Sequence, residues 1–148
     1  MKNLRKILVV EDNPNDLELT LSALARNRLA NEVVIARDGE EALDYLYGRG
    51  KHEGRPRENP LVVFLDVKMP KVDGMEVLRQ LKGDTDLKMI PVVMLTSSRE
   101  EVDLMRSYEL GVNAYVVKPV GFQQFVEAIA HSGMFWAALN EPPPERGA

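Results

Sequence analysis

The chain has 148 residues, no cysteine and a formal net charge of −4, from 19 basic and 23 acidic side chains. This length fits one domain that buries its core without disulfides, and the acidic balance argues against a general nucleic-acid surface, which is usually strongly basic. The sequence contains no secretory segment and no apolar run of membrane-spanning length, so we expect an intracellular, cytoplasmic protein that makes no membrane contact.

Five short apolar segments alternate along the chain with five segments of helical periodicity. The expected strands are residues 7–10, 33–36, 61–65, 91–95 and 114–117. The expected helices lie between Pro14 and about Arg28, between Asp38 and Gly48, between Asp73 and Gly83, between Ser98 and Gly111, and over 122–129. Short connections between such elements make successive strands parallel with right-handed crossovers. The expected fold class is therefore α/β, a doubly wound five-stranded parallel sheet with five helices.

Capping residues mark several of these helix ends. Asp38 with Glu41, and Ser98 with Glu101, have the spacing of a capping box. Gly48 is expected to end the second helix, because glycine adopts the left-handed conformation that closes many helices.

The segment 48–60 has three glycines, two prolines and no apolar periodicity, so it is predicted to be a long loop. It is either a solvated surface loop or a mildly basic docking edge, since it carries Arg49, Lys51, Arg55 and Arg57. His52 has no potential ligand partner nearby in sequence, which argues against a histidine metal site.

Acidic residues follow two of the buried strands. Asp66 ends the strand 61–65, and Glu11 with Asp12 ends the strand 7–10. Alone, Asp66 could simply cap the turn that follows it. In open α/β sheets, however, ligands bind outside the carboxyl ends of the strands, where all three acids should meet. Clustered carboxylates take up protons or bind a cation, and oxygen ligands without histidine or cysteine select Mg²⁺.

The two remaining strands deliver Thr96 and Lys118 to the same edge. A divalent ion, an ammonium group and a hydroxyl around one carboxylate suit phosphoryl transfer, which requires positioning and neutralisation of the phosphoryl oxygens. Asp66 would then be a nucleophile as well as a ligand.

Four motifs in order resemble the signature set of the response-regulator receiver domain, the CheY-like family. They are Glu11-Asp12, the run from Leu65 to Gly74, Leu95-Thr96-Ser97, and the run from Tyr115 to Pro119. The spacings from Asp66 to the later motifs also match, and the resemblance covers residues 5 to about 131. It implies the flavodoxin-like strand order 2-1-3-4-5.

The resemblance implies a metal site in which Asp12 and Asp66 hold Mg²⁺ directly. The backbone carbonyl of Lys68 would complete the shell, and Glu11 would act through water. Asp66 would be the phosphoacceptor for a phosphohistidine on a sensor histidine kinase.

Further roles are implied for residues around the acceptor. Lys118 would pair with the phosphoryl group, and its bond to Pro119 would be cis. Thr96 and Tyr115 would form the switch pair. Lys68 and Ser98 would flank the phosphoryl group and modulate its lifetime, although a Lys68 side chain directed to solvent is an equally good expectation.

The domain organisation is expected to be a stand-alone receiver over 1–140 with an extended C-terminal helix, followed by a disordered tail over 141–148. The long loop and the extended helix resemble the regulators that are paired with bacterial phytochromes. Six successive apolar residues, 134–139, favour a homodimer through this helix and the neighbouring face of helix four and strand five. The alternative is that the extension folds back over its own domain.

Three other functions fit these residues less well. A haloacid-dehalogenase-like phosphatase would require a second aspartate two residues after Asp66, where this chain has Lys68. A flavin-binding module would require a phosphate loop after the first strand, where Glu11 and Asp12 would repel a phosphate. An inactive receiver that acts as a docking module is disfavoured because the motif set is complete. The chain is therefore not expected to be an enzyme.

Overall fold

The computed structural model describes residues 5–26, 31–56, 58–96 and 101–117. In this part of the chain, five parallel strands form one sheet in the order β2-β1-β3-β4-β5. The strands are β1 (Ile7–Val10), β2 (Val33–Ala36), β3 (Val62–Leu65), β4 (Val92–Thr96) and β5 (Ala114–Val117). The predicted α/β class and strand order are confirmed.

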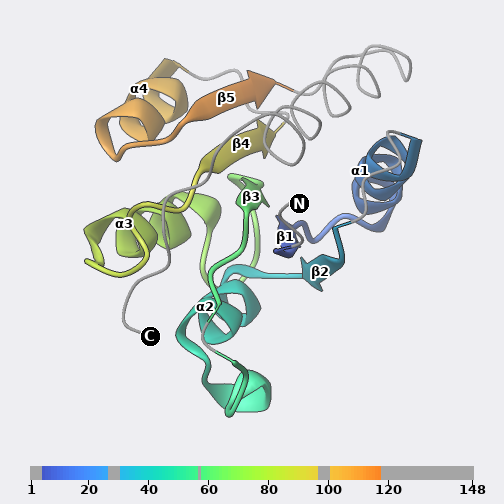
Figure 1. The fold of residues 1–148 in the computed structure, drawn as a ribbon. Helices are drawn as coiled ribbons and strands as arrows, with labels where there is room; N and C mark the ends of the chain where they lie inside the picture. The colour runs from blue at the N-terminus through green and yellow to red at the C-terminus, as the bar shows by residue number, and fades with distance from the viewer. Residues whose placement is uncertain (1–4, 27–30, 57, 97–100, 118–148) are drawn as a thin grey trace.

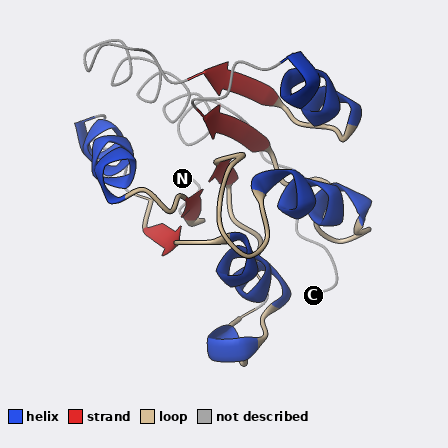
Figure 2. Cartoon of the chain, turned by 180° about the vertical axis from the view of Figure 1, so that it is seen from behind, coloured by secondary structure: helices blue, strands red, loops and turns tan. Residues whose placement is uncertain are grey.

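Four α-helices and one short 3-10 helix accompany the sheet within the described residues. They are α1 (Pro14–Arg26), α2 (Gly39–Tyr47), η1 (Gly50–His52), α3 (Gly74–Gly83) and α4 (Glu101–Glu109). Helix α1 covers one face of the sheet, and α2, α3 and α4 lie on the other (Figures 1 and 2). The predicted fifth helix, 122–129, and the apolar extension, 134–139, lie outside the described residues.

Each face of the sheet has its own hydrophobic core because alternate side chains of a strand point to opposite faces. Ile7, Val9 and Phe64 pack with α1, and Leu8, Val10 and Leu65 pack with α2 and α3. Strands buried on both faces read as continuous apolar runs, which is why the sequence located them well.

The ends of α2 and the start of α3 follow the predicted capping chemistry, whereas Ser98, expected to cap α4, lies outside the described residues. The Asp38 side chain accepts a hydrogen bond from the Glu41 backbone N–H at 2.8 Å, and Asp73 does the same for Glu76 at 3.0 Å. Gly48 closes α2 with φ 68°, in the left-handed region that favours glycine. These caps set where α2 and α3 begin, beside the carboxyl edge of the sheet.

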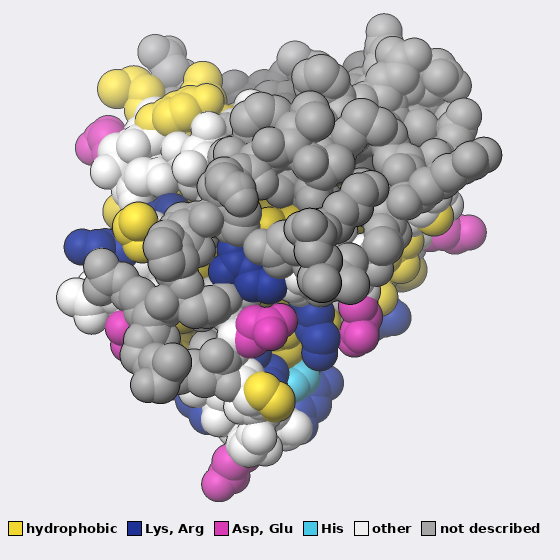
Figure 3. Space-filling view, in the orientation of Figure 1, with side chains coloured by type: hydrophobic (Ala, Val, Ile, Leu, Met, Phe, Trp, Pro, Cys, Tyr) yellow, Lys and Arg dark blue, Asp and Glu magenta, His cyan; other side chains and the backbone are white. Residues whose placement is uncertain are grey.

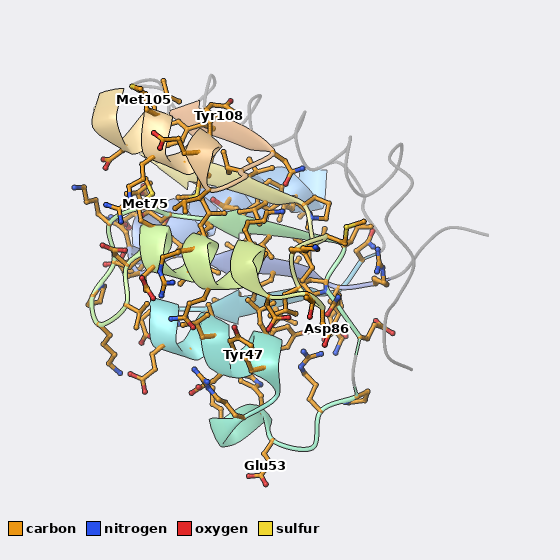
Figure 4. All side chains as sticks on the ribbon, turned by 90° about the vertical axis from the view of Figure 1, so that its left-hand side faces the viewer. Tyr47, Glu53, Met75, Asp86, Met105 and Tyr108 are labelled. Carbon is orange, nitrogen blue, oxygen red and sulfur yellow. The ribbon has the colours of Figure 1, made fainter. Side chains whose placement is uncertain are left out.

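The predicted loop 48–60 is more ordered than the sequence suggested. It contains the helix η1, and the His52 ring packs edge-on against Tyr45 with centroids 5.1 Å apart. Arg55, expected either in solvent or on a docking edge, instead lies over the Tyr45 ring at 4.1 Å. Figure 3 shows the histidine and neighbouring basic side chains gathered at the bottom of the view, and Glu53 points outward at the tip of the loop in Figure 4. Arg55 is therefore part of the fold, a role that neither expectation for this loop included.

None of the helices in the described segments is long and apolar enough to cross a membrane.

Candidate functional site

The register of the central strands places two predicted acids side by side. Val10 of β1 lies opposite Leu65 of β3, so the next residues, Glu11 and Asp66, leave the sheet together at its carboxyl edge. The Asp66 backbone N–H donates to the Val10 carbonyl at 3.2 Å, and the Glu11 N–H donates to the Ala36 carbonyl at 3.0 Å. The backbone pairing of β3 with β1, and of β1 with β2, thus continues for one residue beyond the strands. This pairing fixes the backbone positions of Asp66 and Glu11.

Three carboxylates meet at this edge. Glu11, Asp12 and Asp66 each present a carboxylate oxygen, and these oxygens lie within 4.8 Å of one another. Glu11 is 3 % exposed and Asp66 8 % exposed, whereas Asp12 is open to solvent. Glu11 also accepts a hydrogen bond from the Asn13 backbone N–H at 3.2 Å. The structure therefore brings together the three acids that the sequence predicted to meet.

The chemistry of this group fits a hard divalent cation. Like charges at this separation favour the binding of a cation, and partial burial strengthens the effect by limiting solvent screening. The ligand atoms are all oxygens, which is the set that Mg²⁺ and related ions prefer. Asp12 is exposed, so the acidic group borders solvent on one side.

The predicted switch residues lie further along the same sheet. Thr96 is the last residue of β4 and pairs with Val117 of β5, which puts its backbone at the carboxyl edge. Tyr115 lies opposite Met94, two residues before that edge, and its half-buried side chain packs against the core on the α2 and α3 face. The two residues thus lie on neighbouring strands.

Several predicted site residues cannot be placed. The Thr96 side chain, Ser98, Lys118 and the bond to Pro119 lie outside the described part of the structure. Their predicted roles, and the cis form of the Lys118–Pro119 bond, stay predictions.

Lys68 has a partner that the sequence did not suggest. Its side chain is 67 % exposed, and its Nζ lies 3.9 Å from Oδ2 of Asp103 on α4. Lys68 is exposed, as one of the two expectations held, but its ammonium also lies near α4, which neither expectation included. Asp103 was missed because no local pattern relates a lysine in one loop to an aspartate in a distant helix.

Comparisons with known proteins agree with this geometry. The family model for the response regulator receiver domain matches residues 7–130. Response regulator Rcp1 from Synechocystis sp. is 40 % identical over 130 residues, which is 88 % of this chain and 87 % of that protein. A crystal structure of the Mn²⁺-bound form of Rcp1 superposes with a TM-score of 0.88 at 38 % identity, covering 95 % of this chain and 99 % of that one.

Two other solved structures resemble the chain over nearly their whole length. The bacteriophytochrome response regulator AtBRR is 67 % identical, with a TM-score of 0.76 and coverage of 94 % of this chain and 99 % of that one. The phosphorylated cyanobacterial phytochrome response regulator RcpA is 39 % identical, with a TM-score of 0.89 and coverage of 96 % of this chain and 100 % of that one.

Proposed function

The chain belongs to the response regulator receiver domain family, whose members are signalling proteins rather than enzymes, and from this premise we propose that Asp66 is the phosphoacceptor of a two-component phosphorelay. The observation that carries the proposal is the meeting of Glu11, Asp12 and Asp66 at the end of the central buried strand. Because the chain belongs to this family, we no longer consider a haloacid-dehalogenase-like phosphatase or a flavin-binding module. The inactive docking module differs from the proposal only in whether Asp66 is phosphorylated.

The proposed metal ligands are Asp12, Asp66 and the backbone carbonyl of Lys68, with Glu11 acting through water. The all-oxygen donor set supports Mg²⁺ in this role. Bound Mg²⁺ would neutralise charge on the phosphoryl oxygens.

Asp66 performs the transfer itself. One of its carboxylate oxygens attacks the phosphorus of a phosphohistidine, a new P–O bond forms, and the P–N bond to the kinase imidazole breaks. The imidazole leaves with the bonding electron pair and takes up a proton. Asp66 is 8 % exposed and directly follows β3, whose own residues are buried.

Lys118 would pair with the transferred group, and Thr96 with Tyr115 would carry the change to the surface of β5 and α4. The position of Thr96 at the end of β4 and the half-burial of Tyr115 support this assignment. Receiver signalling then consists of two states that bind partners differently.

The proposed donor is a sensor histidine kinase of the phytochrome type. The support is the likeness to AtBRR and RcpA, which are a bacteriophytochrome and a cyanobacterial phytochrome response regulator. The cytoplasmic location and the boundaries 1–140 and 141–148 remain parts of this proposal.

A homodimer through α4, β5 and the C-terminal extension is also proposed. Three large side chains of α4 are exposed, with Leu104 at 38 %, Met105 at 56 % and Tyr108 at 54 %. Hydrophobic side chains gather at the upper left of Figure 3, and Figure 4 shows Met105 and Tyr108 on α4. Light scattering should give a dimer mass for the full chain and a monomer mass after truncation beyond Ser132. A full-length monomer would contradict this assembly.

The test of the acceptor is phosphoryl transfer from phosphorylated kinases and from a small acyl phosphate. Asp66→Asn should abolish acid-labile labelling, whereas Asp86→Asn, a matched change in the α3–β4 connection far from the acidic site in sequence, should leave it intact. Stoichiometric labelling of Asp66→Asn would refute the assignment. Ranking candidate kinases by transfer rate at short times would identify the cognate donor.

A further inference from the structure

The acceptor loop, Asp66–Asp73, connects β3 to α3 and carries the acceptor and the proposed carbonyl ligand of Lys68. Its two ends are held together by Gly74. The Gly74 backbone N–H donates to the Val67 carbonyl at 2.8 Å, and a Cβ at Gly74 would lie 1.9 Å from the Asp66 carbonyl oxygen. The loop therefore closes on itself with no room for a side chain at its base.

The end of the acceptor loop, at Val72, packs against the first residue of α2. A Cβ at Gly39 would lie 1.8 Å from the Val72 carbonyl oxygen and 2.6 Å from its carbonyl carbon. The φ of Gly39 is not positive, so its backbone is one that other residues adopt. Glycine is needed there for space, and the obstructing atoms are backbone, which cannot rotate away like the end of a flexible side chain.

Asp38 adds a second attachment between α2 and this loop. One of its carboxylate oxygens caps α2 by accepting from the Glu41 N–H at 2.8 Å, and the other lies 3.6 Å from Nζ of Lys71. Lys71 has φ 65°, and it is the one non-glycine residue with positive φ in the described part of the chain. A lysine in this conformation is strained and persists where its surroundings hold it.

We propose that Asp38 and Gly39 are positioning residues for the acidic site and that they act through the acceptor loop. Gly39 lets Val72 approach α2, Asp38 holds Lys71 in its strained conformation, and the placement of the Lys68 carbonyl relative to Asp66 follows from both contacts. Groups that orient a metal's ligands affect metal affinity even though they do not touch the ion. This inference rests on the proposed metal site. It states that the start of α2, through Asp38 and Gly39, positions the acceptor loop for metal binding.

The main test is Gly39→Ala, with Gly83→Ala as its matched control. Both changes add one methyl group at the end of a helix, but a Cβ at Gly83 would have nothing within 4 Å. Mg²⁺ titrated calorimetrically into the full chain should bind about tenfold more weakly to Gly39→Ala and equally well to Gly83→Ala. In the metal-free protein, hydrogen exchange of the Gly74 amide should be faster in Gly39→Ala alone. Unchanged Mg²⁺ affinity in folded Gly39→Ala would overturn the proposal.

Lys71→Ala decides the question if Gly39→Ala does not fold. The Lys71 side chain is 61 % exposed, so its removal should not unfold the chain. Removal of a positive charge near an acidic site would by itself strengthen Mg²⁺ binding, whereas loss of the attachment to Asp38 should weaken it about twofold. Stronger binding by Lys71→Ala would overturn the proposal.

Failure of this inference differs from failure of the proposed function. If the unaltered chain binds no Mg²⁺ at millimolar concentration, or if Asp12→Asn leaves binding unchanged, the metal site itself is wrong. If the unaltered chain binds Mg²⁺ and the Gly39→Ala and Lys71→Ala variants bind it equally well, only the positioning role of Asp38 and Gly39 is wrong.

Discussion

Two loops flank the central strand β3, and they are held in different ways. The α2–β3 connection, residues 48–61, precedes the strand, and the acceptor loop follows it at the opposite edge of the sheet (Figure 1). Arg55 organises the first. Its guanidinium donates to the carbonyls of Tyr45, Pro56 and Glu58 at 2.9–3.0 Å and to that of Leu46 at 3.5 Å, and it lies over the Tyr45 ring.

The acceptor loop depends instead on close backbone packing against its neighbours. Gly39 and Gly74 give it the space to approach α2 and the end of β3, and Lys71 and Lys68 pair with acids on α2 and α4. A loop organised by one of its own side chains is local, so damage to it should stay local. A loop seated on several elements transmits their movements to the site, which suits a signalling domain.

Gly74→Ala should have the largest effect on stability and should show how tightly the acceptor loop is seated. The added methyl group would overlap the Asp66 carbonyl oxygen, which belongs to the backbone at the end of a buried strand. We expect the free energy of unfolding to fall by about 3 kcal/mol, as for severe overpacking. Urea unfolding measures it, with Gly83→Ala as the control, and a change below about 1 kcal/mol would show that the loop yields easily.

Arg55→Ala tests whether the α2–β3 connection is energetically local. Loss of its hydrogen bonds to backbone carbonyls should lower the free energy of unfolding by about 2 kcal/mol, because two part-buried acceptors, the carbonyls of Tyr45 and Leu46, lose their donor. Arg49→Ala, which removes one exposed ion pair with Asp44, should cost less than about 1 kcal/mol.

The same Arg55→Ala protein should bind Mg²⁺ with unchanged affinity. Calorimetric titration beside Gly39→Ala makes this comparison directly. If Arg55→Ala weakens Mg²⁺ binding as much as Gly39→Ala does, the two loops are coupled and the contrast drawn between them is wrong.

Asp66→Asn should stabilise the metal-free protein by about 1 kcal/mol, because it removes one of three like charges gathered within 4.8 Å. Addition of Mg²⁺ should raise the melting temperature of the unaltered chain, since the folded state alone holds the assembled site. It should have little effect on Asp66→Asn. Calorimetric scans with and without Mg²⁺ measure both effects. If metal-free Asp66→Asn melts below the unaltered chain, repulsion among the three carboxylates does not destabilise the fold.

Lys68 and Asp103 test the attachment of the acceptor loop to α4. If Asp103 draws the Lys68 ammonium away from the phosphoryl group, Lys68→Ala and Asp103→Asn should change the decay rate of the acyl phosphate in opposite directions, each about twofold for an exposed pair. Lys68 is expected to slow hydrolysis by obstructing water, so decay should be faster in Lys68→Ala. An effect of Asp103→Asn that persists in the Lys68→Ala background would exclude this competition.

The smallest expected effect concerns α3, which follows the acceptor loop. Hydrogen bonds from Arg79 and Gln80 lower the pKa of Glu76 to about 2. A lowered pKa means that the pair contributes stability above the ordinary pKa near 4.5, and that this contribution is lost as the pH falls toward 2. The Arg79 side chain is exposed and solvent screens the pair, so Arg79→Ala should reduce the free energy of unfolding only slightly at pH 7, and still less at pH 2.

The sequence by itself determined the strands, the strand order through the family resemblance, and the acidic group. Buried parallel strands are continuous apolar runs, and the caps at Asp38 and Gly48 depend on neighbours a few residues away. Glu11, Asp12 and Asp66 could be brought together because parallel strands must deliver their carboxyl ends to one edge. The strand ends differ from the prediction by about one residue, as β3 begins at Val62 instead of Leu61, and the helix η1 was not predicted.

Only the tertiary structure decided how the acceptor loop is seated. The contact of Gly39 with Val72 and the approach of Lys68 to Asp103 join elements far apart in the chain, and neither leaves a periodic or local pattern. The sequence predicted for Arg55 either a solvated loop or a docking edge, because composition records its charge but not the carbonyls that it binds. Such contacts depend on how close and at what angle the packed elements lie, which only the assembled core fixes.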